Sequence, residues 1–350
     1  MITAKLQRKA QAGARRLRAW SDEWTYQRLR QQTLPVPMEY TTLGRTNLRV
    51  SVMGLGSGGA SQLGLKRGHG ERHAIRLIQR ALDHGINLLD TAYAYGNEAV
   101  IGKAIQGRDR DRIVISTKRL TTFGGEFIAP DKLSRVIDKS LERLGTDYID
   151  IFHMHGVELD QYDYALHTLV PVLQAAKQAG KIRYIGITET FSKDIGHAAL
   201  QRALQDDVWD VMMVGFNLLN QTARTRVIEP AQAKNIGILN MFAVRRALTD
   251  VRSLTPILDA LMEAQKLSRA DFKDGKVLAE WLSQVSGSQA LTETAYRYCR
   301  HEPGIDTVLF GTSSLQHLDQ NIESLLKPAL DNATWAKINS LFEQIHGISG

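Results

Sequence analysis

The sequence predicts an α/β protein folded as one closed barrel of eight parallel strands with a helix after each strand. Short apolar runs rich in β-branched residues alternate with longer stretches of helical periodicity through most of the 350 residues, which is typical of βα units. The alternation repeats eight times in one run. Because right-handed crossovers return every helix to the outside of the sheet, this run indicates a barrel and one domain over residues 38–350.

Residues 1–37 precede the barrel and predict a basic amphipathic helix. Apolar side chains, among them Leu6, Leu17, Trp20 and Trp24, recur at steps of three and four between arginines, as on one face of a helix. The segment carries eight basic and two acidic side chains. We expect a helical N-terminal extension with two possible roles: packing on the barrel, or contact with a partner protein or a membrane surface.

Charge and cysteine content exclude several classes of protein. The net charge is +7, but the N-terminal extension accounts for most of it, so the near-neutral barrel gives no overall charge argument for a nucleic-acid surface. No apolar run is long enough to predict a transmembrane segment. The single cysteine, Cys299, can form neither an internal disulfide nor a multi-thiolate metal site. We expect a cytoplasmic protein with a small-molecule partner and no nucleic-acid partner.

The elements follow in a regular order. A β-hairpin is predicted first, with strands at 39–43 and 48–52 joined by the turn 44–47. The eight barrel strands are expected at 52–55, 87–89, 113–117, 149–154, 184–188, 211–216, 238–241 and 307–310. Helical patterns cover 72–84, 98–106, 131–144, 168–179, 195–204, 222–234, 291–300 and 315–326. Residues 247–289 exceed a simple loop and are partly helical, so they predict a flap over the barrel mouth.

Two local motifs point to other functions, and their context argues against both. Residues 54–59 match the G-x-G-x-x-G pattern of dinucleotide-binding domains, yet no helix begins directly after them. We interpret these glycines as a tight loop at the barrel mouth. His153 and His155 face the same side of one strand, as metal ligands can, but later strand ends offer few further ligands. No metal site is expected.

A third constellation comes from successive strand ends. Asp90 and Tyr95 follow the second strand, Lys118 the third and His155 the fourth, and the carboxyl ends of barrel strands lie on one face. An ammonium group favours the phenolate form of a nearby tyrosine, so we expect Lys118 to lower the pKa of Tyr95 from its usual value of about 10. Asp90 would hold Lys118 charged, and His155 would position a carbonyl oxygen. The group predicts acid–base catalysis at a carbonyl.

Several longer segments resemble the aldo-keto reductase family. The similarity runs from about Met38 to Asn321 and is carried by 40–51 (YTTLGRTNLRVS), 85–96 (GINLLDTAYAYG), 140–150 (SLERLGTDYID), 180–187 (GKIRYIGI) and 311–314 (GTSS). The resemblance implies a (β/α)8 TIM barrel without a Rossmann domain and a nicotinamide cofactor at its mouth. It implies the same four catalytic residues, Asp90, Tyr95, Lys118 and His155, and leaves His153 as a side chain that lines the barrel.

The resemblance also assigns cofactor positions, some of which depart from the family pattern. Thr188 and Glu189 stand where the family has Ser-Asn against the nicotinamide carboxamide, and Met213 stands where it has Gln. The aromatic residue that stacks on the nicotinamide corresponds to Met241 or Phe242, and Phe242 is preferred for its aromatic face. Arg245 would meet the pyrophosphate or form a loop salt bridge. The remaining cofactor contacts are expected from Gly56, Gly311, Thr312, Ser313, His317, Gln320 and Asn321.

These features predict an NAD(P)-dependent oxidoreductase acting on an aldehyde, ketone or sugar carbonyl. Residues 150–158 (DIFHMHGVE) are most similar to the sugar-dehydrogenase branch of the family. A cofactor-binding regulatory subunit or a partner-binding module on the same fold is the alternative. Residues 310–321 contain no Arg or Lys to meet a ribose 2′-phosphate, whereas hydroxyl groups and a helix N-terminus can bind one. NADP(H) is expected over NAD(H).

Overall fold

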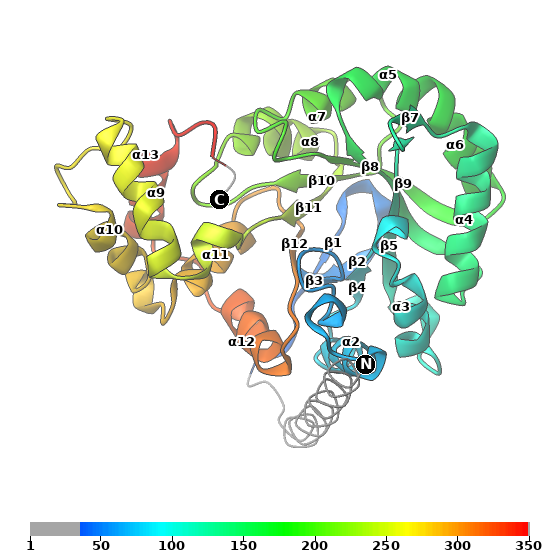
Figure 1. Ribbon diagram of the computed structural model, residues 1–350, viewed down its shortest axis with the longest axis horizontal. Helices are drawn as coiled ribbons and strands as arrows, with labels where there is room; N and C mark the ends of the chain where they lie inside the picture. Colours follow the sequence, from blue (N-terminus) through cyan, green and yellow to red (C-terminus); the bar gives the residue numbers. More distant parts are fainter. Residues whose placement is uncertain (1–35, 349–350) are drawn as a thin grey trace, which may run out of the picture.

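A closed barrel of eight parallel strands forms the centre of the molecule (Figure 1). The computed structural model describes residues 36–348, so most of the predicted N-terminal extension lies outside the described residues. The strands are, in barrel order, β3 (Met53–Gly56), β4 (Leu88–Asp90), β5 (Val114–Leu120), β8 (Ile149–Val157), β9 (Ile182–Glu189), β10 (Val211–Gly215), β11 (Gly237–Met241) and β12 (Thr307–Phe310). β12 pairs with β3 through Val308 opposite Met53, which closes the barrel. The predicted barrel and its eight strands are confirmed.

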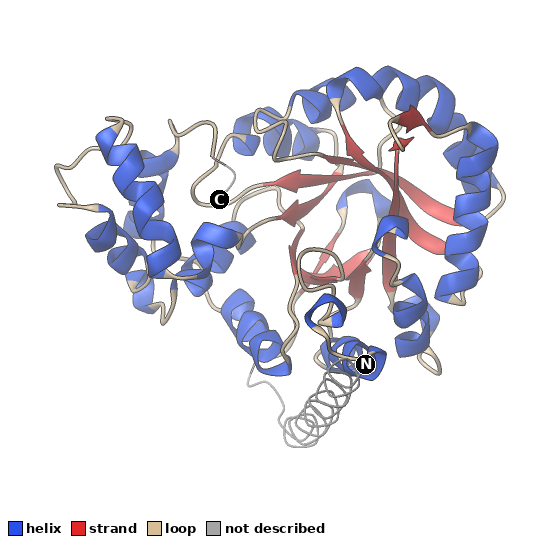
Figure 2. Cartoon of the chain, in the orientation of Figure 1, coloured by secondary structure: helices blue, strands red, loops and turns tan. Residues whose placement is uncertain are grey.

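Helices cover the outside of the barrel, as Figure 2 shows. The predicted helical stretches coincide largely with α2 (Glu71–Asp83), α3 (Glu98–Ile105), α4 (Pro130–Leu144), α6 (Val170–Gln178), α7 (Ala198–Ala203), α8 (Glu229–Ala233), α11 (Leu291–Arg300) and α12 (Leu315–Leu326). Their apolar faces point inward, and on α2 the buried residues include Leu77, Ile78 and Ala81. Within residues 36–348, no helix has the length and apolar character needed to cross a membrane.

The predicted hairpin closes the amino-terminal end of the barrel. β1 (Tyr40–Thr42) and β2 (Arg49–Ser51) pair in antiparallel fashion. Their apolar side chains join the interior residues of the barrel in one buried cluster, which consists of Leu43, Leu48, Val50, Leu88, Val114, Ile151, Val211, Met213 and Leu239. The hairpin is therefore a plug, and burial of its leucines ties it to the barrel.

The inward side chains of the strands change from apolar to polar toward the carboxyl end of the barrel. On β4 the interior residue Leu88 is followed two positions later by Asp90. On β5 the interior residue Val114 is followed by Ser116 and Lys118, both of which contact Asp90. Because alternate residues of a strand face the same side, polar groups gather at one end of the barrel, and the candidate site lies there.

A hairpin and a last helix add to the predicted elements, and the segment predicted to be partly helical contains two helices. A small hairpin, β6 (Thr122–Phe123) and β7 (Glu126–Phe127), follows β5. Residues 247–289 contain α9 (Val251–Glu263) and α10 (Gly275–Leu282), which contact each other and lie to one side of the barrel in Figure 1. A last helix, α13 (Asn332–Phe342), follows α12. That residues 247–289 act as a flap over the mouth stays a prediction.

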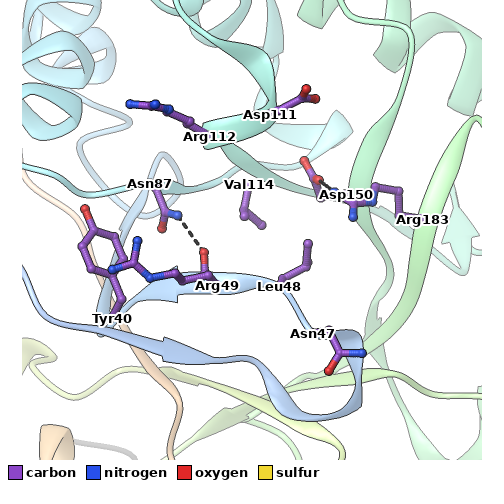
Figure 3. A pocket seen from close by; sticks show the side chains of 10 residues that line it. All are labelled: Tyr40, Asn47, Leu48, Arg49, Asn87, Asp111, Arg112, Val114, Asp150 and Arg183. Atoms are coloured by element: carbon purple, nitrogen blue, oxygen red, sulfur yellow. Dashed lines mark hydrogen bonds and ion pairs between the residues drawn. The ribbon is translucent and has the colours of Figure 1, made fainter.

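A cavity of about 640 Å³ lies at the amino-terminal end of the strands, beside the plug (Figure 3). Its lining includes residues from the starts of barrel strands, such as Asp150 of β8 and Arg183 of β9. Arg183 donates to the Asp150 carboxylate at 2.9 Å, and the Asn87 amide donates to the Arg49 carbonyl at 2.8 Å. This cavity lies at the opposite end of the barrel from the predicted catalytic residues, so it is not the candidate catalytic site.

Gly44, in the turn of the plug, allows a close approach to the barrel. Its φ is +44°, and a Cβ atom there would lie 2.2 Å from the backbone nitrogen of Gly237. We expect Gly44→Ala to lower the free energy of unfolding by at least about 3 kcal/mol, because left-handed strain adds to a backbone clash. Denaturant unfolding measures this loss.

The matched control for this prediction is Gly107→Ala. Gly107 also has a positive φ, of +74°, but a Cβ atom there would meet nothing within 4 Å. Gly107→Ala should therefore lower the free energy of unfolding only by the strain of a left-handed backbone, about 1–2 kcal/mol. Equal losses in the two variants would show that the contact with Gly237 contributes nothing.

Candidate active site

A buried ion pair joins the carboxyl ends of β4 and β5. Lys118 is 1% exposed, and its Nζ lies 2.5 and 2.7 Å from the two carboxylate oxygens of Asp90. The same ammonium donates to the Thr91 carbonyl at 2.8 Å, and the Ser116 hydroxyl donates to Asp90 at 2.8 Å. Three acceptors thus satisfy the three ammonium protons, which allows a full positive charge to stay buried.

Tyr95 lies beside this pair on the short turn Tyr93–Tyr95 that follows β4. The Lys118 Nζ is 5.6 Å from the centre of its ring. Gly58 lies against the Tyr95 ring, because a Cβ atom there would approach Tyr95 Cε2 to 2.6 Å. Burial raises the pKa of Tyr95, and Lys118 opposes this rise only in part. The predicted lowering of this pKa is therefore wrong, since desolvation of the phenolate outweighs the nearby cation.

His155, on β8, is the fourth member of the group. Its ring meets the Tyr95 ring edge-on, with 5.8 Å between the ring centres and 85° between the planes. Burial, together with the charges of Lys118 and Arg119, lowers the pKa of His155 to about 3. The imidazole is therefore neutral at physiological pH and offers one N–H donor and one acceptor.

His153 lies deeper in the barrel, two residues before His155. It is fully buried, and a Cβ atom on Gly186 would lie 2.1 Å from its Nδ1, so the absence of a side chain at Gly186 makes room for the ring. Burial lowers the pKa of His153 well below its usual value. In the described part of the chain, no group of three or more His, Cys, Asp or Glu side chains could hold a metal ion. His153 lines the barrel interior.

Several predicted cofactor positions lie at the mouth of the barrel. Thr188 is buried, and its hydroxyl accepts from the Gly156 amide at 2.7 Å. Met213 belongs to the interior cluster. Gly56 and Gly311, at the ends of β3 and β12, approach closely, because a Cβ atom on Gly311 would lie 3.3 Å from the Gly56 carbonyl oxygen.

Glu189 faces away from the barrel interior and forms a buried acid–imidazole pair. Its carboxylate lies 2.9 Å from His197 Nδ1 and accepts from the Gly215 amide at 2.8 Å. His197 in turn lies 2.9 Å from the Thr222 hydroxyl. Burial raises the pKa of Glu189, while His197 and the Gly215 amide lower it in part. These contacts favour a structural role for Glu189 over the predicted contact with the carboxamide, and sequence reasoning missed His197.

An aromatic stack extends from this pair toward the predicted pyrophosphate site. The Phe191 ring lies 5.7 Å from that of His197 and 5.8 Å from that of Phe242. The Arg245 guanidinium carbon is 4.5 Å from the centre of the Phe242 ring. Met241, by contrast, packs against the interior cluster. Of the two candidates for the stacking side chain, Met241 therefore faces the barrel interior, whereas Phe242 packs against Phe191 and Arg245.

The loop after β12 leads into α12 and carries most of the remaining predicted contacts. Ser314 caps this helix by accepting from the His317 amide at 3.3 Å, and its own amide donates to the Thr312 hydroxyl at 3.1 Å. His73 of α2 lies 2.8 Å from the Ser313 carbonyl oxygen. The other predicted side chains of this region, His317, Gln320 and Asn321, lie on α12 and are exposed or half-buried. Sequence reasoning missed His73 because it is distant along the chain.

Comparison with known proteins identifies the family. Residues 53–343 match the model described as the aldo/keto reductase family. The chain belongs to the aldo-keto reductase family. L-galactose dehydrogenase of Arabidopsis thaliana is 27% identical over 321 residues, which cover 89% of this chain and 97% of that protein. D-threo-aldose 1-dehydrogenase of Pseudomonas sp is 33% identical over 215 residues, or 53% of this chain and 64% of that protein.

A solved structure agrees with this assignment. The holo form of the aldo-keto reductase AKR11C1 from Bacillus halodurans has a TM-score of 0.67 and 25% identity, and the match covers 88% of this chain and 99% of that one. The aldo-keto reductase described here is thus an NAD(P)-dependent carbonyl oxidoreductase. The similar proteins named above are dehydrogenases or reductases, so they give no support to the regulatory-subunit alternative.

The neutral state of His155 predicts how stability depends on pH. The unfolded chain binds a proton at this histidine below a pKa of about 6.5, whereas the folded chain does so only below about 3. Acidification between these values therefore favours the unfolded state. We expect the free energy of unfolding to fall less steeply in His155→Gln than in the wild type between pH 6 and pH 4, by up to about 1.4 kcal/mol per pH unit. Denaturant unfolding at each pH measures the two slopes.

His301→Gln provides the comparison for this measurement, because that half-buried histidine lies outside the site and bonds the Lys327 carbonyl. The His301 variant should keep the wild-type slope more closely than the His155 variant. Parallel slopes in His155→Gln and the wild type would contradict a neutral His155.

Proposed function

We propose that Asp90, Tyr95, Lys118 and His155 form the catalytic tetrad of this reductase. The observation that carries the proposal is the buried Lys118–Asp90 pair, with Lys118 Nζ 5.6 Å from the ring centre of Tyr95. A buried ammonium that faces a phenol gives that phenol a stabilised conjugate base. Structural ion pairs are common in proteins, but here a tyrosine and a neutral histidine lie beside the pair at the mouth of the barrel, which favours a catalytic role.

A nicotinamide cofactor, when bound, supplies a hydride to the carbonyl carbon in reduction and accepts it back in oxidation. The Tyr95 hydroxyl donates its proton to the carbonyl oxygen as that oxygen gains charge, which yields the alcohol and leaves a phenolate on Tyr95. Lys118 stabilises the phenolate, and Asp90 keeps Lys118 in place. The raised pKa of Tyr95 holds its proton in place at neutral pH until the transfer.

His155 orients the substrate in this mechanism. The imidazole is neutral and therefore has one N–H group, which can donate a hydrogen bond to the same carbonyl oxygen. The Nδ1 atom of His155 is buried and accepts no hydrogen bond within residues 36–348. The ring therefore has a polar atom available to a ligand or a water molecule.

The cofactor is held, in this proposal, along the mouth from Met241 to α12. Arg245 has a buried nitrogen, Nη1, without a hydrogen-bond partner in the described chain, which fits a pyrophosphate better than a loop salt bridge. The amide and hydroxyl groups around Thr312 and Ser314, at the N-terminus of α12, fit a phosphate. His317 on the first turn of α12 adds a donor, so NADP(H) is preferred over NAD(H).

The proposed substrates are aldehydes, ketones and sugar carbonyls. The names of two relatives, L-galactose dehydrogenase and D-threo-aldose 1-dehydrogenase, support a sugar or similar polyhydroxy carbonyl.

The lone cysteine, Cys299, is buried and unbridged, which fits the reducing conditions of the cytoplasm.

Replacement of Tyr95 tests the tetrad. We expect Tyr95→Phe to lower kcat about 10²- to 10⁴-fold on a reactive aldehyde, because the general acid is lost. The dissociation constant for the cofactor should change little, since the ring is retained. Tyr148→Phe is the control, because this phenol lies at the opposite end of the barrel and donates to Asp111. Near wild-type turnover in Tyr95→Phe would exclude the proposed acid.

Cofactor preference is tested by tryptophan fluorescence titration with NADPH and NADH. NADPH should bind more tightly, its advantage should shrink with added salt, and His317→Ala should weaken NADPH binding about threefold or more while leaving NADH binding nearly constant. Gln316→Ala, at the neighbouring exposed position, is the matched control. An NADPH preference that responds to neither salt nor His317→Ala would place the 2′-phosphate elsewhere.

A further inference from the structure

The cavity beside the plug has no part in the mechanism described above. It lies at the amino-terminal end of the strands, and its volume of about 640 Å³ falls in the range of small-molecule sites, about 300–1,000 Å³. The residues that line it are Tyr40, Asn47, Leu48, Arg49, Asn87, Asp111, Arg112, Val114, Asp150 and Arg183 (Figure 3). A cavity of this size can hold a small organic molecule.

The cavity has an apolar floor and a basic rim. Leu48 of the plug and Val114 of β5 form the floor, and both are buried members of the interior cluster. Figure 3 shows these two side chains in the middle, with Arg49 and Arg112 to one side and Arg183 to the other. An apolar surface with a few polar groups around it is typical of a ligand site.

The charge of Arg183 is fixed in place but only partly balanced. Asp150 is 1% exposed, and one of its carboxylate oxygens accepts from Arg183 at 2.9 Å. The other oxygen accepts from Arg110 at 2.7 Å and from the Ile115 amide at 2.9 Å. One carboxylate thus faces two guanidinium groups. Because Arg110 already offsets the charge of Asp150, the cluster keeps a net charge of one, and it is Arg183 that lines the cavity.

Arg49 provides a second cation that the protein does not balance. Within residues 36–348 its guanidinium forms no ion pair with a carboxylate. Its Cζ lies 4.0 Å from the centre of the Tyr40 ring, and the Tyr40 hydroxyl donates to the Gly85 carbonyl at 2.9 Å. An aromatic face orients a guanidinium and leaves its N–H edges available for hydrogen bonds.

The remaining charged groups of the lining do not cancel these two cations. Arg112 is exposed and pairs with Asp109 at 3.2 Å, so it contributes little to either sign. Asp111 accepts from the Tyr148 hydroxyl at 2.7 Å. In Figure 3 its carboxylate points away from the apolar floor. The cavity therefore has an excess of positive charge near its floor.

The N-terminal extension is a poor occupant for this cavity. Residues 1–37 carry eight basic and two acidic side chains, and they would add cations to a site that already has too many. The excess charge favours an occupant of opposite sign, and the enclosed floor favours a small molecule over a protein surface.

We propose that the cavity beside the plug binds a small organic anion with two or more negative groups, of the phosphate-ester or polycarboxylate class, at a site separate from the catalytic mouth. Arg49 and Arg183 each meet one anionic group through charge-assisted hydrogen bonds. The carbon skeleton of the ligand lies on Leu48 and Val114. Because the site contains residues of both the plug and the barrel, the bound anion stabilises the contact between them.

Isothermal titration calorimetry on the full-length protein tests the proposal. The ligands are 2,3-bisphosphoglycerate for the phosphate class and benzene-1,3,5-tricarboxylate for the carboxylate class. Neither has an aldehyde or ketone, and excess NADP⁺ is present to fill any dinucleotide site. At least one of them should bind with one site per chain. Arg49→Gln and Arg183→Gln should each raise its dissociation constant tenfold or more, which corresponds to about 1.4 kcal/mol.

Arg135→Gln is the matched control. It removes the same charge from an exposed position on α4, where Arg135 pairs with Asp131, and it should change the dissociation constant less than twofold. Arg183→Gln also removes a cation from Asp150, whereas Arg49→Gln breaks no ion pair. The Arg49 variant therefore decides the test if the Arg183 variant does not fold. Failure of both ligands to bind the wild type, or equal binding to the wild type and Arg49→Gln, would overturn the proposal.

Two further measurements locate the site. The bound ligand should raise Tm in the wild type and in Arg135→Gln, and much less in Arg49→Gln. Tyr95→Phe, which changes the opposite end of the barrel, should bind the ligand as the wild type does. Binding that is lost in Tyr95→Phe but kept in Arg49→Gln would place the anion in the catalytic mouth and contradict a separate site.

Discussion

The buried contact between Lys118 and Asp90 is the interaction on which the catalytic end of the barrel depends. It joins the ends of two neighbouring strands, β4 and β5, and satisfies an ammonium that is almost fully removed from water. Loss of either partner would leave a buried charge, which costs about 3–5 kcal/mol. The same cation lowers the pKa of His155 and opposes the rise in the pKa of Tyr95. One ion pair thus helps to set the protonation state of both neighbours.

A second buried carboxylate organises the other half of the mouth. The Glu189 carboxylate accepts a hydrogen bond from the Gly215 amide at the end of β10 and pairs with His197. The His197 ring stacks on Phe191. Gly215 has no side chain where Phe191 lies, since a Cβ atom there would approach the ring to 2.4 Å. Phe191 in turn supports Phe242 and, beyond it, Arg245. The position of Arg245 therefore depends on buried Glu189 through this series of ring contacts.

The sequence predicts the barrel and the tetrad well, for a physical reason. β-Branched runs mark the strands, and a parallel barrel brings strand ends together whatever lies between them. It does not predict burial depth, so the pKa of Tyr95 was expected in the wrong direction. Strand alternation places Met241 on the interior face, whereas ring chemistry favours Phe242, so two signals in the sequence disagree at this position. The contacts of His73 and His197 join distant segments of the chain, which no local pattern contains.

Closure of the barrel through β12 has a consequence for how the chain reaches this structure during synthesis. β3 needs two neighbours, and one of them, β12, lies some 250 residues later in the chain. Until β12 has emerged from the ribosome, β3 presents an unpaired edge. Contacts of such long range form slowly, and the exposed edge invites association with other chains in the meantime. The nascent protein is therefore most vulnerable to aggregation shortly before its last strand emerges.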